Sequence, residues 1–152
     1  MGRILFVLTT LLIGCTLNST GQSKIKIACV GNSITYGSGI SNREQQSYPA
    51  QLQFWLGKDY EVKNFGVGGA TLLKNGDKPY WNQPEYLQVK EYQPDIIIIK
   101  LGTNDSKPQN WKFASEFEAD YSSMVNEFLK FKSRPRVMLA LPVPVFIDEK
   151  WG

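Results

Sequence analysis

The chain has 152 residues, of which 42% are hydrophobic and 20% charged, and its formal net charge is +3. This length fits one small domain, and the apolar fraction is ordinary for a globular core, which excludes wholesale disorder. The small net charge, without a run of lysine and arginine, gives no electrostatic footprint for nucleic acid. The sequence contains no histidine, so imidazole is excluded as a metal ligand and as a general base within this chain.

Residues 1–23 have the composition of an export leader and linker. Arg3 precedes an apolar stretch at residues 4–13, which is too short for a spanning helix of roughly 20 residues. The sequence Leu12-Ile-Gly-Cys15 resembles the bacterial lipobox, in which the cysteine is lipidated and becomes the mature N-terminus. We therefore expect an exported protein, periplasmic, at the cell surface or secreted, and lipidation at Cys15 would tether it to a membrane. The alternative is ordinary cleavage within Thr16–Ser23, which would leave a soluble protein.

Short apolar runs predict buried strands. Ile25–Val30 and Tyr60–Phe65 are two such runs, and Asp95–Lys100 contains four consecutive isoleucines. The isoleucines have no period of two, so we expect both faces of this strand to be covered, as in a parallel sheet. Arg136–Leu141 is a fourth run, which prolines end. Cys29 lies in the first run and is predicted to be a small buried hydrophobe.

Helical patterns lie between these runs. Ser47 is a candidate N-cap for a helix that Gly57 closes. The expected apolar face of this helix consists of Tyr48, Leu52, Trp55 and Leu56. A short helix opens at Pro84, and a longer one follows Ser115, which with Glu118 would form a capping box. Residues 31–46, 74–84 and 101–110 have the composition of loops. The strand–helix alternation predicts a doubly wound α/β sheet with right-handed crossovers.

Three of the strands are followed by loops rich in glycine and polar side chains. These loops are Gly31–Gly37 (GNSITYG), Asn64–Thr71 (NFGVGGAT) and Gly102–Asp105 (GTND). In such folds ligands bind at the carboxyl ends of the strands. There the loops would supply a serine hydroxyl, glycine amides and an asparagine carboxamide, the nucleophile and oxyanion donors that acyl transfer needs. Each loop alone predicts only a turn or a cap, but their combination indicates a hydrolase site.

The three loops resemble the first three sequence blocks of the SGNH (GDSL-type) hydrolases, and the resemblance covers about residues 25–141. It implies a flavodoxin-like three-layer α/β/α sandwich with a mainly parallel sheet. It also implies that Ser33 is the nucleophile and forms an acyl-enzyme. The implied oxyanion hole consists of the Ser33 amide, a glycine amide of the second block and the Asn104 side chain, and the spacing favours Gly69 over Gly68. Asn32 stands where the family usually has aspartate, and either side chain can accept a hydrogen bond in the loop.

The family's fourth block, Asp-x-x-His, which supplies the base and its orienting acid, is absent. Asp148 is followed by Glu-Lys-Trp-Gly and cannot be that aspartate. A serine hydroxyl without a base is a poor nucleophile near neutral pH. We therefore expect the hydrolase domain, residues 24–152, to lack its C-terminal part, and the chain alone to have little or no turnover, while the full-length protein is an active serine esterase. The alternatives are an inactive relative and a non-catalytic carbohydrate-binding protein.

Three further sequence segments are similar to those of exported carbohydrate esterases of the sialate O-acetylesterase-like group. They are Lys78–Trp81, Gln93–Asp95 and Leu101–Pro108. This resemblance implies removal of acetyl groups from sugars. Tyr80 and Trp81 are candidate substrate-binding residues, since aromatic faces can stack on a sugar ring. The alternative is that both rings pack the loop onto the domain, which is the reading that we favour for Trp111.

Other chemistries find little support. Gly66–Gly69 does not fit the dinucleotide fingerprint G-x-G-x-x-G, and no G-K-[ST] is present, so a phosphate- or nucleotide-binding protein is the weaker alternative. Without histidine or a cysteine pair at ligand spacing we predict no metal, and the implied reaction needs no cofactor. The expected partner is an acetylated carbohydrate or another small ester.

Overall fold

The computed structural model describes residues 23–142. The predicted leader with Cys15, and Asp148 near the other end, lie outside these residues. Within the described part of the chain, no helix combines the length and the apolar character that crossing a membrane requires.

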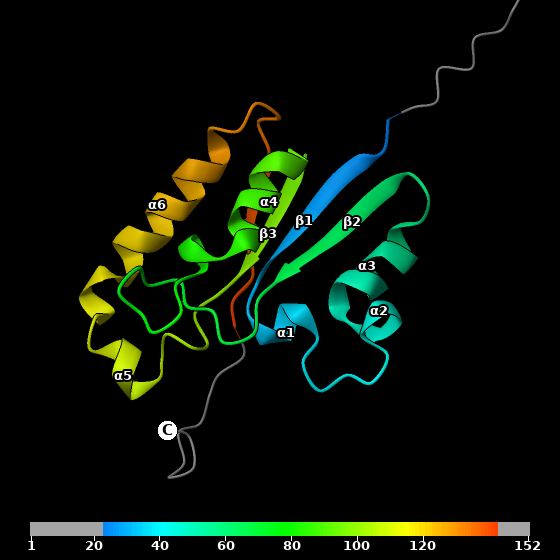
Figure 1. The fold of residues 1–152 in the computed structure, drawn as a ribbon. Helices are drawn as coiled ribbons and strands as arrows, with labels where there is room; N and C mark the ends of the chain where they lie inside the picture. Colours follow the sequence, from blue (N-terminus) through cyan, green and yellow to red (C-terminus); the bar gives the residue numbers. More distant parts are fainter. Residues whose placement is uncertain (1–22, 143–152) are drawn as a thin grey trace, which may run out of the picture.

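The described residues form one parallel sheet of four strands in the order β2-β1-β3-β4 (Figure 1). The strands are β1 (Ile25–Gly31), β2 (Tyr60–Gly66), β3 (Ile96–Lys100) and β4 (Arg136–Leu139). Each of them was predicted, with bounds that differ by at most two residues at either end. The register places Gly31 beside both Gly66 and Lys100. The carboxyl ends of β2, β1 and β3 are therefore level with one another.

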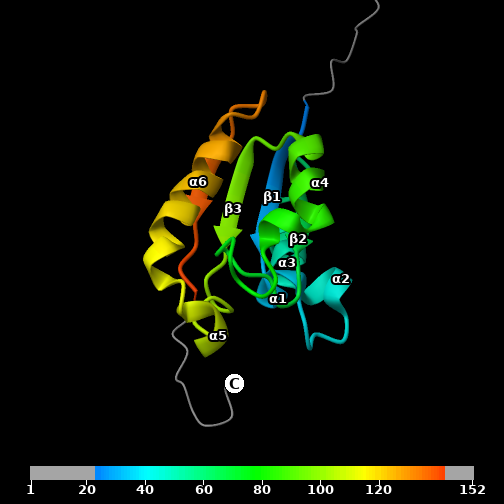
Figure 2. The same cartoon turned by 60° about the vertical axis from the view of Figure 1, so that its left-hand side comes forward.

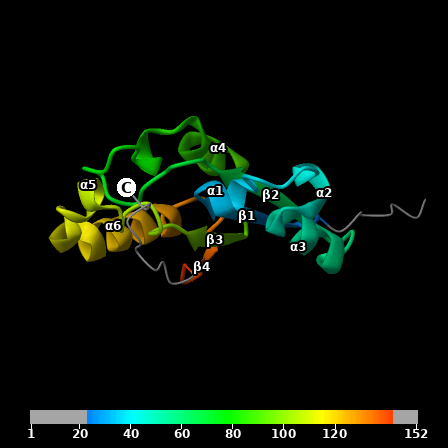
Figure 3. The ribbon, with the colours of Figure 1, turned by 90° about the horizontal axis from the view of Figure 1, so that it is seen from below.

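Six α-helices connect and cover the strands. They are α1 (Ser33–Tyr36), α2 (Arg43–Gln46), α3 (Tyr48–Leu56), α4 (Pro84–Tyr92), α5 (Pro108–Trp111) and α6 (Phe117–Leu129), together with the 3₁₀ turns η1 (Tyr80–Asn82) and η2 (Ala114–Glu116). Viewed along the strands, α4 and α6 lie on one side of the sheet and α3 on the other (Figure 3). This confirms the three-layer α/β/α architecture expected from the sequence.

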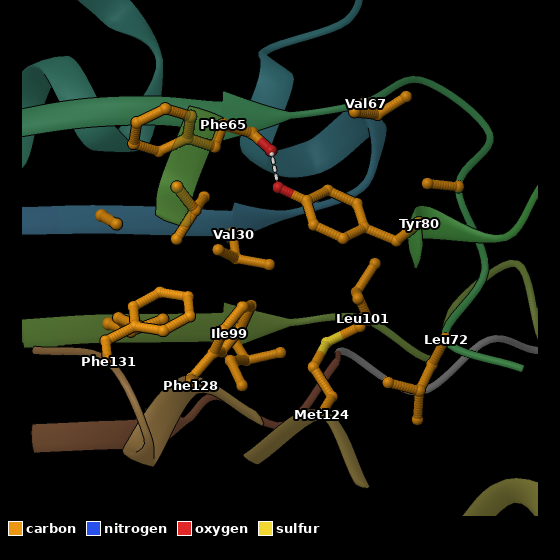
Figure 4. Packing of buried hydrophobic residues seen from close by; sticks show 14 residues of the cluster. Val30, Phe65, Val67, Leu72, Tyr80, Ile99, Leu101, Met124, Phe128 and Phe131 are labelled. Atoms are coloured by element: carbon orange, nitrogen blue, oxygen red, sulfur yellow. Dashed lines mark hydrogen bonds between the residues drawn. The ribbon is translucent and has the colours of Figure 1, made fainter. Parts of the chain in front are cut away.

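The main core lies between the sheet and the pair α4 and α6 (Figure 4). Its fully buried members include Ala28, Val30, Ile97 and Ile99 from the strands, Val89 from α4, and Met124 and Phe128 from α6. Burying one such large side chain stabilises the fold by roughly 1.5–3 kcal/mol. Alternate residues of β1 and β3 supply this face, as the period of a strand requires.

The opposite face of the sheet is covered less completely by the described residues. Cys29 is fully buried there, but Ile96 and Ile98 are half-buried and Met138 is 49% exposed. We expected both faces of the isoleucine run to be covered. This is correct for the core face, where Ile97 and Ile99 are buried, and only partly correct for the other face. The free thiol of Cys29 is the small buried hydrophobe that was predicted, and burial raises its pKa to about 11.

Several local predictions were wrong. The segment 31–46, expected to be a loop, contains α1 and α2, and α5 begins inside the loop expected at 101–110 and ends one residue beyond it. Trp55, placed on the buried face of α3, is 78% exposed, because that helix packs on the sheet with the side of Pro49. The side chain of Ser47 caps no backbone group.

The capping box at Ser115 does not form either. Ser115 lies inside the 3₁₀ turn η2, and α6 begins two residues later at Phe117 without a side-chain cap. The helix expected after Ser115 does form: Met124 and Phe128 of α6 are buried against the sheet, whereas Leu129 at the end of the helix is 49% exposed.

The raised pKa of Cys29 predicts slow thiol chemistry. At pH 8 a thiol with a pKa of about 11 is ionised to about 0.1%, about a hundredfold less than one at its ordinary value of 9.0. We expect the Cys15→Ser variant, which keeps only Cys29, to react with Ellman's reagent in native buffer far more slowly than in 6 M guanidinium. Equal rates in the two solvents would show that the thiol is accessible in the folded chain.

Candidate active site

Ser33 is the first residue of the one-turn helix α1. This helix directly follows β1, one of the two inner strands of the sheet (Figures 1 and 2). The Asn32 side chain caps this helix by accepting a hydrogen bond from the Ile34 backbone N–H at 3.0 Å. Asn32 thus fills the acceptor role that was expected for it. Gly37, in the left-handed conformation with φ +92°, ends the helix after one turn. Ser33 itself is partly exposed.

Two glycines let α1 lie directly on the strand ends. A Cβ atom added to Gly31 would be 2.0 Å from Thr35 Oγ1, and one added to Gly66 would be 2.1 Å from the Tyr36 backbone nitrogen. Neither position has space for a side chain. Asn64 fastens the same contact, because its Nδ2 donates to the Thr35 carbonyl at 2.8 Å and its Oδ1 accepts from the Gly66 N–H at 2.9 Å. The first and second loops are therefore joined immediately beside Ser33.

The second loop makes a tight turn whose two central residues are Gly68 and Gly69. The Ala70 N–H donates to the Val67 carbonyl at 3.2 Å, and Gly69 has φ +79°. Such a turn requires a residue with positive φ at its third position, which favours glycine. Lys78 Nζ donates to the Gly68 carbonyl at 2.8 Å and fixes the turn from outside. Among residues 23–142 the Gly69 N–H has no hydrogen-bond partner, so it is available to a ligand.

The third loop places Asn104 against the second. Asn104 is 6% exposed, and its Nδ2 donates to the Ala70 carbonyl at 2.9 Å. A carboxamide carries two N–H bonds, so this contact orients the group and leaves the second N–H unused. The backbone carbonyl of Asn104 accepts from Asn110 Nδ2 at 2.8 Å. The amide of Asn104 is thus fixed through both its side chain and its backbone.

Asp105, fully buried, connects the same two loops more strongly. Its carboxylate oxygens accept from the backbone N–H groups of Leu72 at 3.1 Å and Leu73 at 2.7 Å. Burial raises the pKa of this carboxyl, while the backbone N–H groups act in the opposite direction. A buried carboxylate that accepts two backbone hydrogen bonds fixes a loop; it is enclosed by protein and has no access to a substrate.

The structure therefore gathers the three predicted site residues at one edge of the sheet. Ser33 follows Gly31 by two residues, Gly69 follows Gly66 by three, and Asn104 follows Lys100 by four, and the register places these strand ends side by side. The backbone N–H of Ser33, like that of Gly69, has no partner among the described residues. A hydroxyl, two free backbone N–H groups and a free carboxamide N–H at one sheet edge are groups suited to hold a polarised carbonyl.

The two aromatic residues predicted to bind substrate, Tyr80 and Trp81, differ in their exposure to solvent. Tyr80 is completely buried, and its hydroxyl donates to the Phe65 carbonyl at 2.7 Å (Figure 4). A ring without exposed surface cannot stack on a sugar, so this prediction does not hold in the structure. Trp81 is partly exposed; its Nε1 donates to the Leu72 carbonyl at 2.7 Å and Lys74 Nζ lies 4.4 Å from its ring centroid. A sugar contact by Trp81 stays a prediction. Trp111 packs on Phe117 and is 50% exposed.

Sequence reasoning missed the polar residues that fix the segment after the second loop. Asn110 accepts from the Asp77 N–H at 2.8 Å, and Asp120 accepts from the Lys74 N–H at 2.8 Å. Both are nearly buried, at 1% and 8% exposure. Their partners lie more than thirty residues away in the chain. The sequence carried no periodic signal for them, since each is a single polar residue in or before a helix.

The chain belongs to the GDSL-like lipase/acylhydrolase family, whose model matches residues 29–150. This family and the parallel sheet with its loops at the strand ends agree with the SGNH resemblance of the three sequence blocks.

The chain is also similar to individual proteins, among them an esterase known from its sequence and one known from its crystal structure. An acetylxylan esterase of Xylanibacter ruminicola is 42% identical over 142 residues, which cover 82% of this chain and 30% of that protein. The chain thus spans less than a third of the length of this curated relative. The crystal structure of AlinE4, an SGNH-hydrolase family esterase, superposes with a TM-score of 0.55 at 24% identity, covering 80% of this chain and 60% of AlinE4. At that identity the likeness supports the fold.

The two glycines of the turn offer a matched pair of variants. Gly69→Ala places a Cβ at φ +79°, which costs about 1 kcal/mol or more, whereas an added Cβ at Gly68 meets no atom within 4 Å. We expect chemical denaturation to show a lower free energy of unfolding for Gly69→Ala and an unchanged one for Gly68→Ala. Equal losses in the two variants would contradict the assignment of the turn.

Asp105 predicts a pH-dependent stability difference. Asp105→Asn replaces one acceptor by a donor that faces a backbone N–H, and we expect a loss of about 1–3 kcal/mol in the free energy of unfolding. Since burial raises the folded-state pKa, the stabilisation by Asp105 is complete below its unfolded pKa of about 4 and declines as the pH rises through the folded value. The gap between wild type and variant should therefore widen as the pH falls toward 4.

Urea titrations at several pH values measure this gap. Asp59→Asn is the control, because the exposed Asp59 side chain makes no hydrogen bond to the described residues. A gap that is absent, or that narrows toward low pH, would contradict the role given to Asp105.

Proposed function

We propose that this protein is the nucleophile-bearing part of a serine esterase. Ser33 is the nucleophile, and the oxyanion hole consists of the Ser33 and Gly69 backbone N–H groups and the Asn104 side chain. One observation carries the proposal: three strand ends in register present these groups at a single edge, Asn64 of the second loop binds the first, and Asn104 of the third loop binds the second. Preorganised donors of this kind stabilise the negative charge that develops on a carbonyl oxygen.

The reaction proceeds in two displacements. The Ser33 hydroxyl attacks the ester carbonyl while its proton passes to a base, and the carbonyl oxygen takes up negative charge between the three donors. The tetrahedral intermediate collapses, the alcohol leaves with a proton from the conjugate acid, and an acyl-serine remains. Water, deprotonated by the same base, then releases the carboxylic acid and restores Ser33.

The base is the part of this chemistry that the 152 residues do not supply, because they contain no histidine. We place the histidine and its orienting aspartate outside residues 1–152. The large share of the acetylxylan esterase that lies beyond its match to this chain is consistent with this placement. The second candidate, a carbohydrate-binding relative without turnover, is favoured only by the missing base.

The proposed substrate is an O-acetyl ester on a carbohydrate. The support is the similarity to an acetylxylan esterase and the further resemblance in the loop sequences. Residues 1–23 are proposed to direct export to the periplasm or the cell surface, and Cys15 to carry a lipid, with a soluble secreted form as the alternative. An enzyme that deacetylates polymeric glycans has to meet them outside the cytoplasm, which agrees with the proposed leader.

Replacing the nucleophile tests the proposal directly. For the protein expressed from its complete reading frame, we expect Ser33→Ala to lower kcat on 4-nitrophenyl acetate about a thousandfold or more, because no other group can form the acyl-enzyme. The conservative Ser38→Ala variant, five residues further on, should keep full activity. Equal rates for wild type and Ser33→Ala would rule out an acyl-serine mechanism.

The missing base makes a separate prediction for residues 1–152 alone. Without a histidine, this chain should hydrolyse the ester at nearly the same low rate as its own Ser33→Ala variant. Added imidazole supplies a base, so it should raise the rate of the chain with Ser33 above that of the variant at the same imidazole concentration. A fast, Ser33-dependent reaction without imidazole would show that a base exists within these residues.

A further inference from the structure

A cavity of about 620 Å³ lies beside the nucleophile helix, on the side of the edge strand β2. It is lined by residues of α1 to α4 and of β2, among them Tyr36, Arg43 and Lys63. Neither Ser33, Gly69 nor Asn104 lines it, so it is distinct from the candidate active site. Its volume lies in the range of pockets that hold small molecules.

The lining residues of the cavity that lie next to α1 are held in place by hydrogen bonds. Asn64 and Gly66 both line the cavity and belong to the contact that fixes α1 on the strand ends. Gln53 of α3, another lining residue, is also fixed, because its Nε2 donates to the Gly57 carbonyl at 2.9 Å and its Oε1 accepts from the Val62 N–H at 2.8 Å. The shape of the cavity is therefore largely formed without a ligand.

Two other lining groups keep their hydrogen-bonding capacity. Glu85 and Gln88 lie three residues apart on α4, so their side chains are neighbours on that helix. Neither makes a hydrogen bond or an ion pair with any described residue. Tyr36 adds an aromatic ring that is 42% exposed, and the Arg43 guanidinium lies 4.0 Å from the centroid of that ring.

The charges in the cavity balance. Arg43 and Lys63 are cationic, Glu44 and Glu85 are anionic, and Arg43 is already paired with Glu44 at 2.8 Å. A cavity without net charge does not select an anion or a cation. A carboxylate, a free carboxamide and a partly exposed tyrosine instead suit a neutral ligand with many hydroxyl groups, which donate to the carboxylate and pack against the ring.

The cavity is close to the nucleophile. Tyr36 follows Ser33 by three residues on the same turn of helix, so the two side chains occupy neighbouring positions only about one helical turn apart. A ligand that contacts both Tyr36 in the cavity and Ser33 must be longer than a single small ester. We propose that this cavity binds a neutral sugar unit of a polymeric substrate, while a nearby unit of the same chain presents its acetyl ester to Ser33. This inference rests on the proposed esterase function and adds a sugar-binding site that is separate from the site of ester hydrolysis.

The test compares a small ester with a long one. The protein expressed from its complete reading frame, and its Glu85→Ala/Gln88→Ala variant, are assayed on 4-nitrophenyl acetate and on acetylated xylo-oligosaccharides. We expect the variant to raise KM for the oligosaccharides about tenfold, because two hydrogen-bonding groups are lost, with kcat unchanged. Both parameters on 4-nitrophenyl acetate should stay within twofold of wild type.

The control is Asn126→Ala/Glu127→Ala on α6, which also removes one carboxamide and one carboxylate but lies outside this cavity. It should leave KM unchanged on both substrates. Thermal denaturation of all variants checks that the fold is retained. We expect this because alanine favours the helix, Glu85 and Gln88 make no hydrogen bonds to described residues, and the control loses only the exposed ion pair of Glu127 with Lys130 at 3.5 Å. An unchanged KM for the oligosaccharides in the Glu85→Ala/Gln88→Ala variant would overturn the inference.

A binding measurement separates this inference from the esterase proposal. Xylohexaose carries no ester, so calorimetric titration with it reports the cavity without any catalysis. Binding by wild type and at least tenfold weaker binding by Glu85→Ala/Gln88→Ala would support the sugar site even if no ester were hydrolysed. Absence of xylohexaose binding at millimolar concentration to wild type would overturn it, even if the protein proved to be an active esterase.

Discussion

The absence of a side chain at Gly31 and Gly66 is the constraint on which the site depends. These two residues end neighbouring strands, and each leaves less than 2.2 Å for a Cβ atom before it meets α1. Because α1 can approach the strand ends so closely, Ser33 lies directly at the end of β1. A methyl group at either glycine would push α1 outward and separate Ser33 from the donors on the other two loops.

Hydrogen bonds from side chains to backbone carry this constraint to the rest of the site. Asn64 joins the second loop to α1, Asn104 joins the third loop to the second, and Asp105 joins them again. The partner in each of these bonds is a backbone group. The bond therefore fixes the path of a loop, and it does not depend on which side chain the partner residue carries. Loops without regular structure thereby gain the rigidity that a preorganised oxyanion site requires, while the sheet beneath supplies only their starting points.

The sequence predicted the positions of the strands well because each is a short apolar run, although three of the four residues of β4 are exposed in the described structure. It predicted the one-turn helices poorly, since α1 depends on the cap at Asn32 and on Gly37 and has no apolar period. The face of α3 was misjudged at Trp55 because apolar residues surround that helix, and only the packing on the sheet decides which of them are buried.

At the site, Ser33, Gly69 and Asn104 could be proposed from motifs, because each belongs to a short block with a recognisable spacing. The contact of Asp105 with Leu72 and Leu73 could not, since it depends on how two loops more than thirty residues apart fold against each other. Tyr80 illustrates the reverse error: an aromatic residue in a loop was predicted to face a ligand, yet the loop folds inward and buries it. The exposure of a loop residue depends on the path of the backbone, which composition does not reveal.

The position of Trp81 gives the molecule an optical property. Its indole N–H donates to the carbonyl of Leu72, which follows Gly69 by three residues, and the ammonium of Lys74 lies over its ring. Trp55 and Trp111, the other tryptophans of the described residues, are at least half exposed and donate no hydrogen bond within them. Indole emission depends on solvent access and on nearby charge. The intrinsic fluorescence of Trp81 is therefore sensitive, without any added label, to the contacts of its ring with Leu72 and Lys74, just after the second loop.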